Sequence, residues 1–294
     1  MSLRALRTLI AISHKGSFVA AAEHLGLTQA AVSLQIKNLE EELGTALFNR
    51  DGRKPKINAS GRLAVERAQE IIGLFDGLHE ELHPDDAIAG ELSLGAVHTV
   101  VTGPLPTVLA RLQSNHKHLR IRLFCSLSAE LAKRIEEDDL DGALITEPIK
   151  QIPSTCQWVA YDTEHFYIAA PKGTSVHSEE TLFREFPFVR FDRTAWAGTM
   201  IEAYLIQRGI RPKDIMEFDT CEAALSLVEQ GLGITVVPLS NKRLKRVKKQ
   251  FSLIPLGHPQ LIRRVGLYQK RQHPKHGILK LILEEMCRET NNLD

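Results

Sequence analysis

The first 44 residues carry apolar positions at helical spacing in three consecutive blocks. They predict helices over 3–14 and 18–25, and a third helix that begins after Thr28. Ser17 and Thr28 each precede a block, where a hydroxyl can cap a helix, and Gly26 stands where helices commonly end. The apolar stripe expected in the core of the third helix consists of Val32, Ile36, Leu39 and Leu43. Together the blocks predict a helix-turn-helix.

A turn signal and a long periodic segment come next. Asp51-Gly52 and Pro55 lie between short extended pieces, which predicts a β-hairpin, or wing, within 47–61. Asn58 precedes a near-heptad repeat and is expected to cap a long helix over about 59–83. Because one apolar seam on so long a helix needs a partner, we expect a homodimer formed through it.

From Glu91 onward, apolar runs typical of strands alternate with amphipathic runs typical of helices. This order predicts an α/β fold with a parallel sheet and right-handed crossovers. The chain therefore divides into a winged helix-turn-helix over 1–58, a linker and dimerisation helix with a hinge over 59–89, and an α/β domain over 90–294.

Composition narrows the class of protein. Apolar residues make up 43% and charged residues 25% of 294, and no apolar run approaches the roughly 20 residues that a membrane span needs. Four cysteines without a CxxC pair argue for a reducing compartment and against structural zinc. The chain starts in an amphipathic pattern rather than a signal-peptide core, so we expect a cytoplasmic protein.

Charge is uneven although the net charge is only +1. Residues 1–58 hold eight Lys and Arg against five acidic residues, and four of these cations fall within Arg50–Lys56. A short basic loop on the predicted wing, rather than a basic domain, is the feature that needs a partner.

A set of residues in fixed register carries a family resemblance over the first 61 residues. These residues are Phe18, Ala21, Ala22, Leu25, Gln29, Ala31, Val32, Ser33, Gln35, Ile36, Leu39, Glu40, Leu43, Gly44, Leu47, Phe48, Arg50 and Gly61. The segment resembles the DNA-binding head of LysR-type transcriptional regulators. The later pieces "GELSLG", "LDGALI", "EQGLGITVVP" and "RVGLYQKR" are similar to that family's effector domain. The chain departs at Asn58, where the family usually has Thr, and at Leu34, which is often polar in relatives.

The resemblance implies a double-stranded DNA-binding regulator. It also implies a C-terminal, two-lobed, periplasmic-binding-protein-like domain that binds a small-molecule effector, with the chain crossing twice between the lobes. Lobe I is then expected over about 90–160 and 267–294, and lobe II over about 161–266. A homotetramer and contact with RNA polymerase are further expectations.

The polar face of the third helix supplies the DNA contacts. With its apolar stripe in the core, the remaining side chains face solvent or DNA, and a helix fits the major groove. Glutamine suits adenine, and the cations suit phosphates. The candidates are Thr28, Gln29, Ala30, Ser33, Leu34, Gln35, Lys37, Arg50, Arg53, Lys54 and Lys56. The alternative is an ordinary solvated face; Leu34 either makes methyl contacts that set the target sequence or has no role.

Hydroxyls that follow predicted strands supply the effector candidates. Carboxyl ends of parallel strands and helix starts form a site for a carboxylate or another anion. The candidates are His98, Thr99, Thr102, Ser126, Ser128, Thr146, Phe191, Trp196 and Thr220. The resemblance implies that Thr99, Thr102 and Ser128 match positions where the family's effectors lie. Helix capping is the alternative role for the hydroxyls, and a structural role is the alternative for His98.

Catalysis, cofactors and metals are not expected. There is no nucleophile elbow, P-loop or phosphate-binding glycine fingerprint, and the histidine pairs lack neighbouring ligands. Cys125 is expected in the core, with a thiol switch to Cys221 as the alternative. The basic run Lys242–Lys249 is expected to be a solvated helix face, with an anionic partner as the alternative. The sequence predicts a LysR-type regulator controlled by a small, anionic effector; redox or protein-partner control, and an enzyme with a DNA-binding head, are the competing hypotheses.

Overall fold

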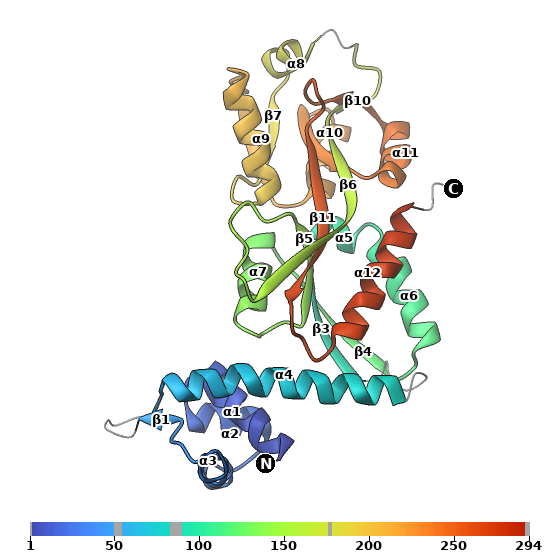
Figure 1. Ribbon diagram of the computed structural model, residues 1–294. Coiled ribbons are helices and arrows are strands. Elements are labelled where there is room, and N and C mark those ends of the chain that lie inside the picture. Colours follow the sequence, from blue (N-terminus) through green and yellow to red (C-terminus); the bar gives the residue numbers. More distant parts are fainter. Residues whose placement is uncertain (1, 50–54, 83–89, 176–177, 292–294) are drawn as a thin grey trace. The chain divides into compact units, whose positions relative to one another are not determined.

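The computed structural model describes residues 2–49, 55–82, 90–175 and 178–291 (Figure 1). The chain forms two compact units. One takes in residues up to 88 together with 271–278, and the other takes in 89–270 and the residues from 279. We call the part of the first unit up to residue 82 the head and its long helix, and the second unit the effector domain. Each is described by itself.

The head contains the predicted helices and wing. Its elements are α1 (Leu3–Lys15), α2 (Phe18–Leu25), α3 (Gln29–Leu43), β1 (Phe48–Asn49), β2 (Lys56–Ile57) and α4 (Ala59–Leu82). The Ser17 Oγ accepts from the Ala20 amide at 3.1 Å, and the Thr28 Oγ1 accepts from the Ala31 amide at 3.2 Å. Gly26 ends α2 in the left-handed conformation, φ +65°. The predicted caps are confirmed.

The core of the head forms where α1, α2 and α3 meet α4. Val32, Ile36 and Leu39 are buried, as expected, but Leu43 is 44% exposed. The prediction for Leu43 is wrong because α3 ends there: its last turn lies beyond the core, and Gly44 turns the chain away. Gly61 packs so closely that a Cβ there would lie 2.2 Å from the Leu47 carbonyl oxygen, so this position requires glycine.

The long helix α4 has two apolar faces. One packs into the head's core through Val65, Ala68 and Ile72. The other is solvent-facing, and its large apolar side chains among those described are Leu63, Ile71, Leu74 and Phe75, with Leu74 77% exposed. Asn58 caps the helix as predicted, since its Oδ1 accepts from the Gly61 amide at 2.8 Å.

The effector domain is built on one nine-stranded sheet in the order β4-β3-β5-β11-β6-β9-β7-β8, with β10 on β6. Its strands are β3 (Gly90–Ala96), β4 (Leu119–Cys125), β5 (Gly142–Thr146), β6 (Cys156–Pro171), β7 (Phe188–Phe191), β8 (Asp214–Phe218), β9 (Ile234–Leu239), β10 (Phe251–Pro255) and β11 (Ile262–Lys270). We call the end with β3–β5 lobe I and the end with β7–β10 lobe II. The long strands β6 and β11 run between them (Figure 1).

The expected parallel pairing is present in each lobe but not at the centre of the sheet. Strands are parallel within each lobe, in β3–β4, β3–β5, β7–β8 and β7–β9. The β5–β11, β11–β6 and β6–β9 pairs are antiparallel. The reason is the double crossing: β6 carries the chain into lobe II and β11 brings it back alongside, in the opposite direction.

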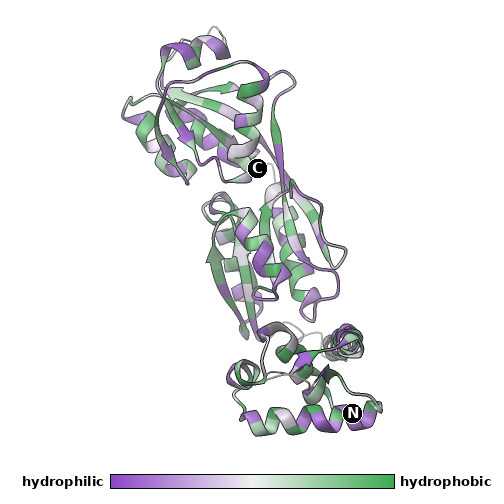
Figure 2. Ribbon diagram, turned by 90° about the vertical axis from the view of Figure 1, so that its left-hand side faces the viewer, coloured by the Kyte–Doolittle hydropathy of each residue, from purple (hydrophilic) through white to green (hydrophobic). Residues whose placement is uncertain are grey.

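Helices cover the sheet in both lobes. They are α5 (His98–Val101), α6 (Leu105–Asn115), α7 (Ser128–Glu136), α8 (Glu179–Glu185), α9 (Trp196–Gln207), α10 (Cys221–Glu229), α11 (Asn241–Gln250) and α12 (His276–Asn291). Much of the sheet is hydrophobic, whereas many surface loops are hydrophilic (Figure 2). In lobe II, Phe166, Phe183 and Phe188 lie at the centre of a large buried cluster. Because the faces of the sheet pack against these helices, the strands are held in place. The positions of the strand ends, where the candidate site lies, are fixed in this way.

Candidate DNA-binding face and effector cleft

The exposed side of α3 forms one continuous face. Gln29, Ala30, Ser33, Leu34 and Lys37 are all exposed, Leu34 by 58%. A groove of about 770 Å³ is lined by most of these side chains, and by the start of α2 and Pro55. Because the buried apolar residues of α3 lie on its other side, this face points outward, as expected from the sequence.

Gln35 is placed differently from its neighbours on α3. It is half-buried, and its Oε1 accepts a hydrogen bond from the Thr8 Oγ1 of α1 at 2.5 Å. Lys37 lies 3.7 Å from Glu41, and both side chains are well exposed. Lys56 is exposed on β2. The candidates Arg50, Arg53 and Lys54 lie outside the described residues.

A cavity of about 340 Å³ lies at the carboxyl ends of the strands in the effector domain. We call it the effector cleft. It brings together eight of the nine effector candidates, from both lobes: His98, Thr99, Ser126, Ser128, Thr146, Phe191, Trp196 and Thr220. Residues that the sequence did not point to also line it, namely Asp192, Asp219 and Arg263.

Several helices start at this cleft. Ser128 begins α7, Trp196 begins α9 and Cys221 begins α10. Thr220 caps α10, its Oγ1 accepting from the Ala223 amide at 3.3 Å, whereas no described side chain caps α7 or α9. The first amides of a helix carry partial positive charges, so each of the three helix starts contributes a locally positive end to the cleft.

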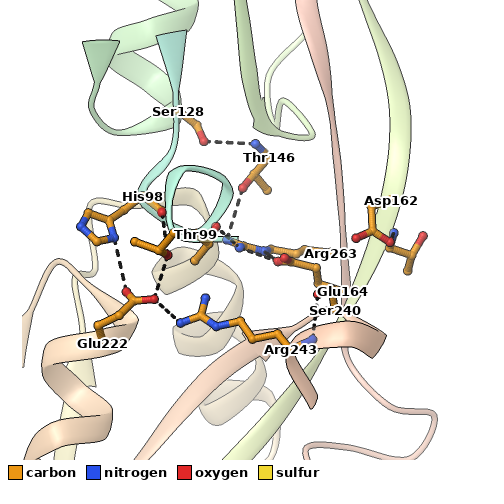
Figure 3. A network of polar contacts seen from close by, with 12 residues as sticks. His98, Thr99, Ser128, Thr146, Asp162, Glu164, Glu222, Ser240, Arg243 and Arg263 are labelled. Carbon is orange, nitrogen blue, oxygen red and sulfur yellow. Dashed lines mark hydrogen bonds and ion pairs between the residues drawn. The ribbon is translucent and has the colours of Figure 1, made fainter. Parts of the chain in front are cut away.

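Arg263 is the one buried cation of the described cleft lining. Its guanidinium donates to Glu164 Oε2 at 2.7 Å, to Thr99 Oγ1 at 2.7 Å and to Thr146 Oγ1 at 3.4 Å (Figure 3). Arg263 and Glu164 are 4% and 7% exposed. The sequence signal was available: Arg263 alternates in phase with the inward residues Val265 and Leu267 of β11.

Thr102, the ninth candidate, lies outside the cleft in a second polar network. Its Oγ1 donates to Glu222 Oε1 at 2.8 Å, and His98 Nδ1 lies 3.3 Å from Glu222 Oε2. Arg243 of α11 pairs with the same carboxylate (Figure 3). Burial raises the pKa of Glu222, but Arg243 and the Thr102 hydrogen bond outweigh it, and the pKa is lowered. One ionised carboxylate thus joins α5 of lobe I to α10 and α11 of lobe II.

Two further expectations need correction. Cys125 is exposed rather than in the core, because β4 is the edge strand of the sheet. Burial raises the pKa of the Cys125 thiol, and raises that of Cys221 to about 11, so neither thiol is activated by its surroundings. In the basic run of α11, Arg243 is buried, whereas the other five cations are exposed as expected.

The described residues contain no helix long and apolar enough to cross a membrane. Nor do they hold a cluster of three or more His, Cys, Asp or Glu side chains arranged to bind a metal ion.

A helix-turn-helix with a wing, followed by a two-lobed domain with a polar cleft, is the architecture of a DNA-binding regulator. The model for bacterial regulatory helix-turn-helix proteins of the lysR family matches residues 3–62, and the LysR substrate-binding domain model matches 85–289. The chain belongs to the LysR family. It is a LysR-type DNA-binding transcriptional regulator with an effector-binding domain.

Known relatives cover most of the chain. The HTH-type transcriptional regulator CzcR of Bacillus anthracis is 34% identical over 240 residues, 82% of this chain and 81% of that protein. A full-length OxyR variant from Pseudomonas aeruginosa has a TM-score of 0.65 at 19% identity, covering 97% of this chain and 94% of that chain. Full-length CbnR complexed with its target DNA has a TM-score of 0.54 at 19% identity, covering 99% of this chain and 100% of that chain. These two structures are similar in fold.

Proposed function

We propose that a small anion bound in the effector cleft controls how this regulator binds double-stranded DNA. The observation that carries the proposal is the convergence of eight sequence-predicted residues on one cavity lined from both lobes. Residues so far apart in sequence gather at a single cavity when the fold has a binding site there. No cofactor is needed for this role, and we assign the chain no catalytic activity.

The chemistry of the cleft favours a ligand with one negative charge. The starts of α7, α9 and α10 favour an anion. The charge of Arg263 is offset by Glu164, and Asp192 and Asp219 also line the cavity. A multiply charged anion would meet these carboxylates. Thr220 and the helix-start amides would then orient a single carboxylate, whereas the Ser126 hydroxyl already donates to Glu130.

Ligand binding would act on the arrangement of the lobes. The cleft walls belong to both lobes, so a ligand that touches both stabilises one closure angle over others. The Glu222 carboxylate already connects Thr102 and His98 of lobe I to Arg243 of lobe II. We infer that this connection is the contact that opens or tightens as the lobes move.

DNA binding is assigned to α3 and the wing. Gln29 and Ser33 are exposed and would reach base edges, and exposed Leu34 would contact a thymine methyl group. Lys37 and Lys56 would meet phosphates, and Thr28 caps the start of the helix. Ala30 leaves room for close approach. Gln35 remains a candidate, although Thr8 occupies its amide oxygen.

Assembly is assigned to α4. Its solvent-facing apolar side chains, Leu63, Ile71, Leu74 and Phe75, favour a homodimer formed through this helix. A homotetramer, contact with RNA polymerase and a cytoplasmic location complete the proposal.

The decisive experiment begins with the DNA. Genome-wide recovery of bound fragments would give the operator and the genes beside it, whose chemistry suggests candidate effectors. Operator affinity of the full chain is then measured with and without each candidate. We expect one small carboxylate to change that affinity by at least about fivefold, the lower range for coupled sites.

Two variants test the site. Ser126→Phe fills the cleft and should abolish the response, whereas Ser114→Phe, at an exposed position of α6, should leave it intact. A full response in Ser126→Phe that disappears in Cys125→Ser/Cys221→Ser would refute ligand control and favour a thiol switch.

A further inference from the structure

A second cavity in the effector domain, of about 200 Å³, shares no lining residue with the effector cleft. It lies between the turn that follows α5, strand β6, and helices α11 and α12. The polar residues that carry the inference are Thr102, Asp162, Lys242, Arg243, Arg246 and Glu289. The proposed function uses two of its lining residues, Thr102 and Arg243, in the contact between the lobes, but it assigns no ligand to this cavity.

Arg243 contributes buried donors that have no acceptor in the described part of the protein. Its side chain is 6% exposed, and its Nη2 pairs with Glu222. Its Nε and Nη1 are buried and have no hydrogen-bond partner among the described residues. Buried guanidinium groups are normally saturated, because each unmet donor carries a desolvation penalty. These two donors therefore favour an acceptor that comes from outside the chain.

The charge of the cavity limits what that acceptor is. Its described lining holds three cations, Lys242, Arg243 and Arg246, against two carboxylates, Asp162 and Glu289. Lys242 pairs with Glu289, which also lies 2.9 Å from Arg111, whereas Arg246 has no ion pair among the described residues. The lining itself thus holds one more cation than carboxylate, although Glu222, outside the lining, already pairs with Arg243. A singly charged anion fits this small excess, and a dianion would be repelled by the carboxylates.

The size and remaining walls favour a short organic acid. The rest of the lining consists of Gly103, Pro104, Ser240 and Thr290, and the methylene stems of the cations add apolar surface. We propose that this cavity is a second ligand site that binds a small monocarboxylate, with Arg243 as the donor to the carboxylate and the apolar body against Pro104.

The second site is connected to the lobes. Arg243 holds the Glu222 carboxylate, which accepts the Thr102 hydrogen bond and lies beside His98. A bound carboxylate shares the Arg243 guanidinium with Glu222, and it therefore weakens the ion pair between Arg243 of α11 and Glu222. Occupancy of the second site therefore changes the contact between lobe I and lobe II.

The test uses sodium butyrate as the probe, with 1-butanol and n-butylammonium chloride as neutral and cationic controls of similar size. Calorimetric titration of the full chain at constant ionic strength should show one saturable butyrate site at this cavity and none for either control. Arg243→Lys keeps a charge for Glu222 but removes the two unmet donors, and should weaken binding about tenfold, as expected for loss of a hydrogen bond to a charged group.

Three variants separate butyrate binding at the second site from binding elsewhere on the chain. Arg246→Gln, at an exposed position, should weaken butyrate binding without affecting folding, whereas Lys249→Gln, exposed on the same helix outside the lining, should not. Ser126→Phe blocks the effector cleft and should leave butyrate binding unchanged. Absence of saturable binding overturns the proposal, and so does binding that survives Arg243→Lys and Arg246→Gln but is lost in Ser126→Phe. Absence of butyrate binding would leave effector control through the cleft untouched, whereas binding lost only in Ser126→Phe would support a carboxylate site in the cleft.

Discussion

The DNA-binding face and the effector cleft contain similar polar residues but are built in different ways. On the face, Gln29, Ser33 and Lys37 lie within one helix, point to solvent and have few partners in the protein. In the cleft, Thr99 and Arg263 are 164 positions apart in sequence, are buried and bond to each other. A face of this kind is set by local periodicity, whereas the cleft is set by topology. Changes in the cleft should therefore reduce stability, and changes on the face should reduce binding.

The largest effect is expected for Arg263→Leu. Removing the arginine leaves Glu164 buried without its partner, which costs about 3–5 kcal/mol in the free energy of unfolding. Urea denaturation followed by tryptophan fluorescence measures it, because the two tryptophans of the chain, Trp158 and Trp196, both lie in the effector domain.

The double variant Arg263→Leu/Glu164→Leu is the matched control. It removes both charges and should recover most of the lost stability, since a buried ion pair can be replaced by apolar side chains at little cost. Equal instability in the single and double variants would mean that Arg263 acts through Thr99 and Thr146 rather than through Glu164.

A smaller effect is expected for Gln29→Ala, and it should appear in binding. Gln29 is exposed at the start of α3, so its loss should weaken operator binding by about 1–3 kcal/mol while leaving the head folded. Binding to the operator and to a scrambled duplex, at fixed salt, measures it. A uniform loss on both duplexes would make Gln29 a phosphate contact rather than a base contact.

Gln35→Ala tests the contrast between binding and structural residues within a single helix, α3. Because the Gln35 amide accepts from the buried Thr8 hydroxyl, its loss should cost about 1 kcal/mol of head stability. Hydrogen exchange of peptides from 3–43 should accelerate, and the same peptides in Gln29→Ala serve as the control. A change in operator discrimination without faster exchange would return Gln35 to the DNA-contacting set.

These contrasts explain which parts of the fold and of the candidate sites could be predicted from the sequence. The apolar steps of α3 placed its core and its outward face, because both follow from one helical period. Leu43 was misplaced since the pattern does not reveal where the core stops. The hydroxyls of the cleft were found because they follow strands, in a fold where strand ends converge. The antiparallel β6–β11 pair and the Arg263–Glu164 pair were missed. Alternation along β11 indicates that Arg263 points inward, but nothing local in the sequence shows which strand lies beside it.

The smallest effect is expected for Asp162→Asn. It tests a carboxyl whose charged form is disfavoured by its surroundings in the effector domain. Burial, and then repulsion from Glu164, raise the pKa of Asp162 from 3.8 to about 6. The folded protein therefore holds this proton more tightly than the unfolded chain. The stability contributed by Asp162 is present below pH 3.8 and is lost as pH rises to about 6.

Asparagine removes this loss and can still accept from the Thr163 amide. At pH 7.5 the variant should be more stable by at most about 1 kcal/mol, since Asp162 is only partly buried and solvent screens it. The gain should shrink at pH 5 and vanish near pH 3.5. Glu91→Gln, at an exposed ion pair of β3, controls for the change in net charge. A gain that is independent of pH would show that packing, rather than ionisation of a buried carboxyl, distinguishes the effector domain here.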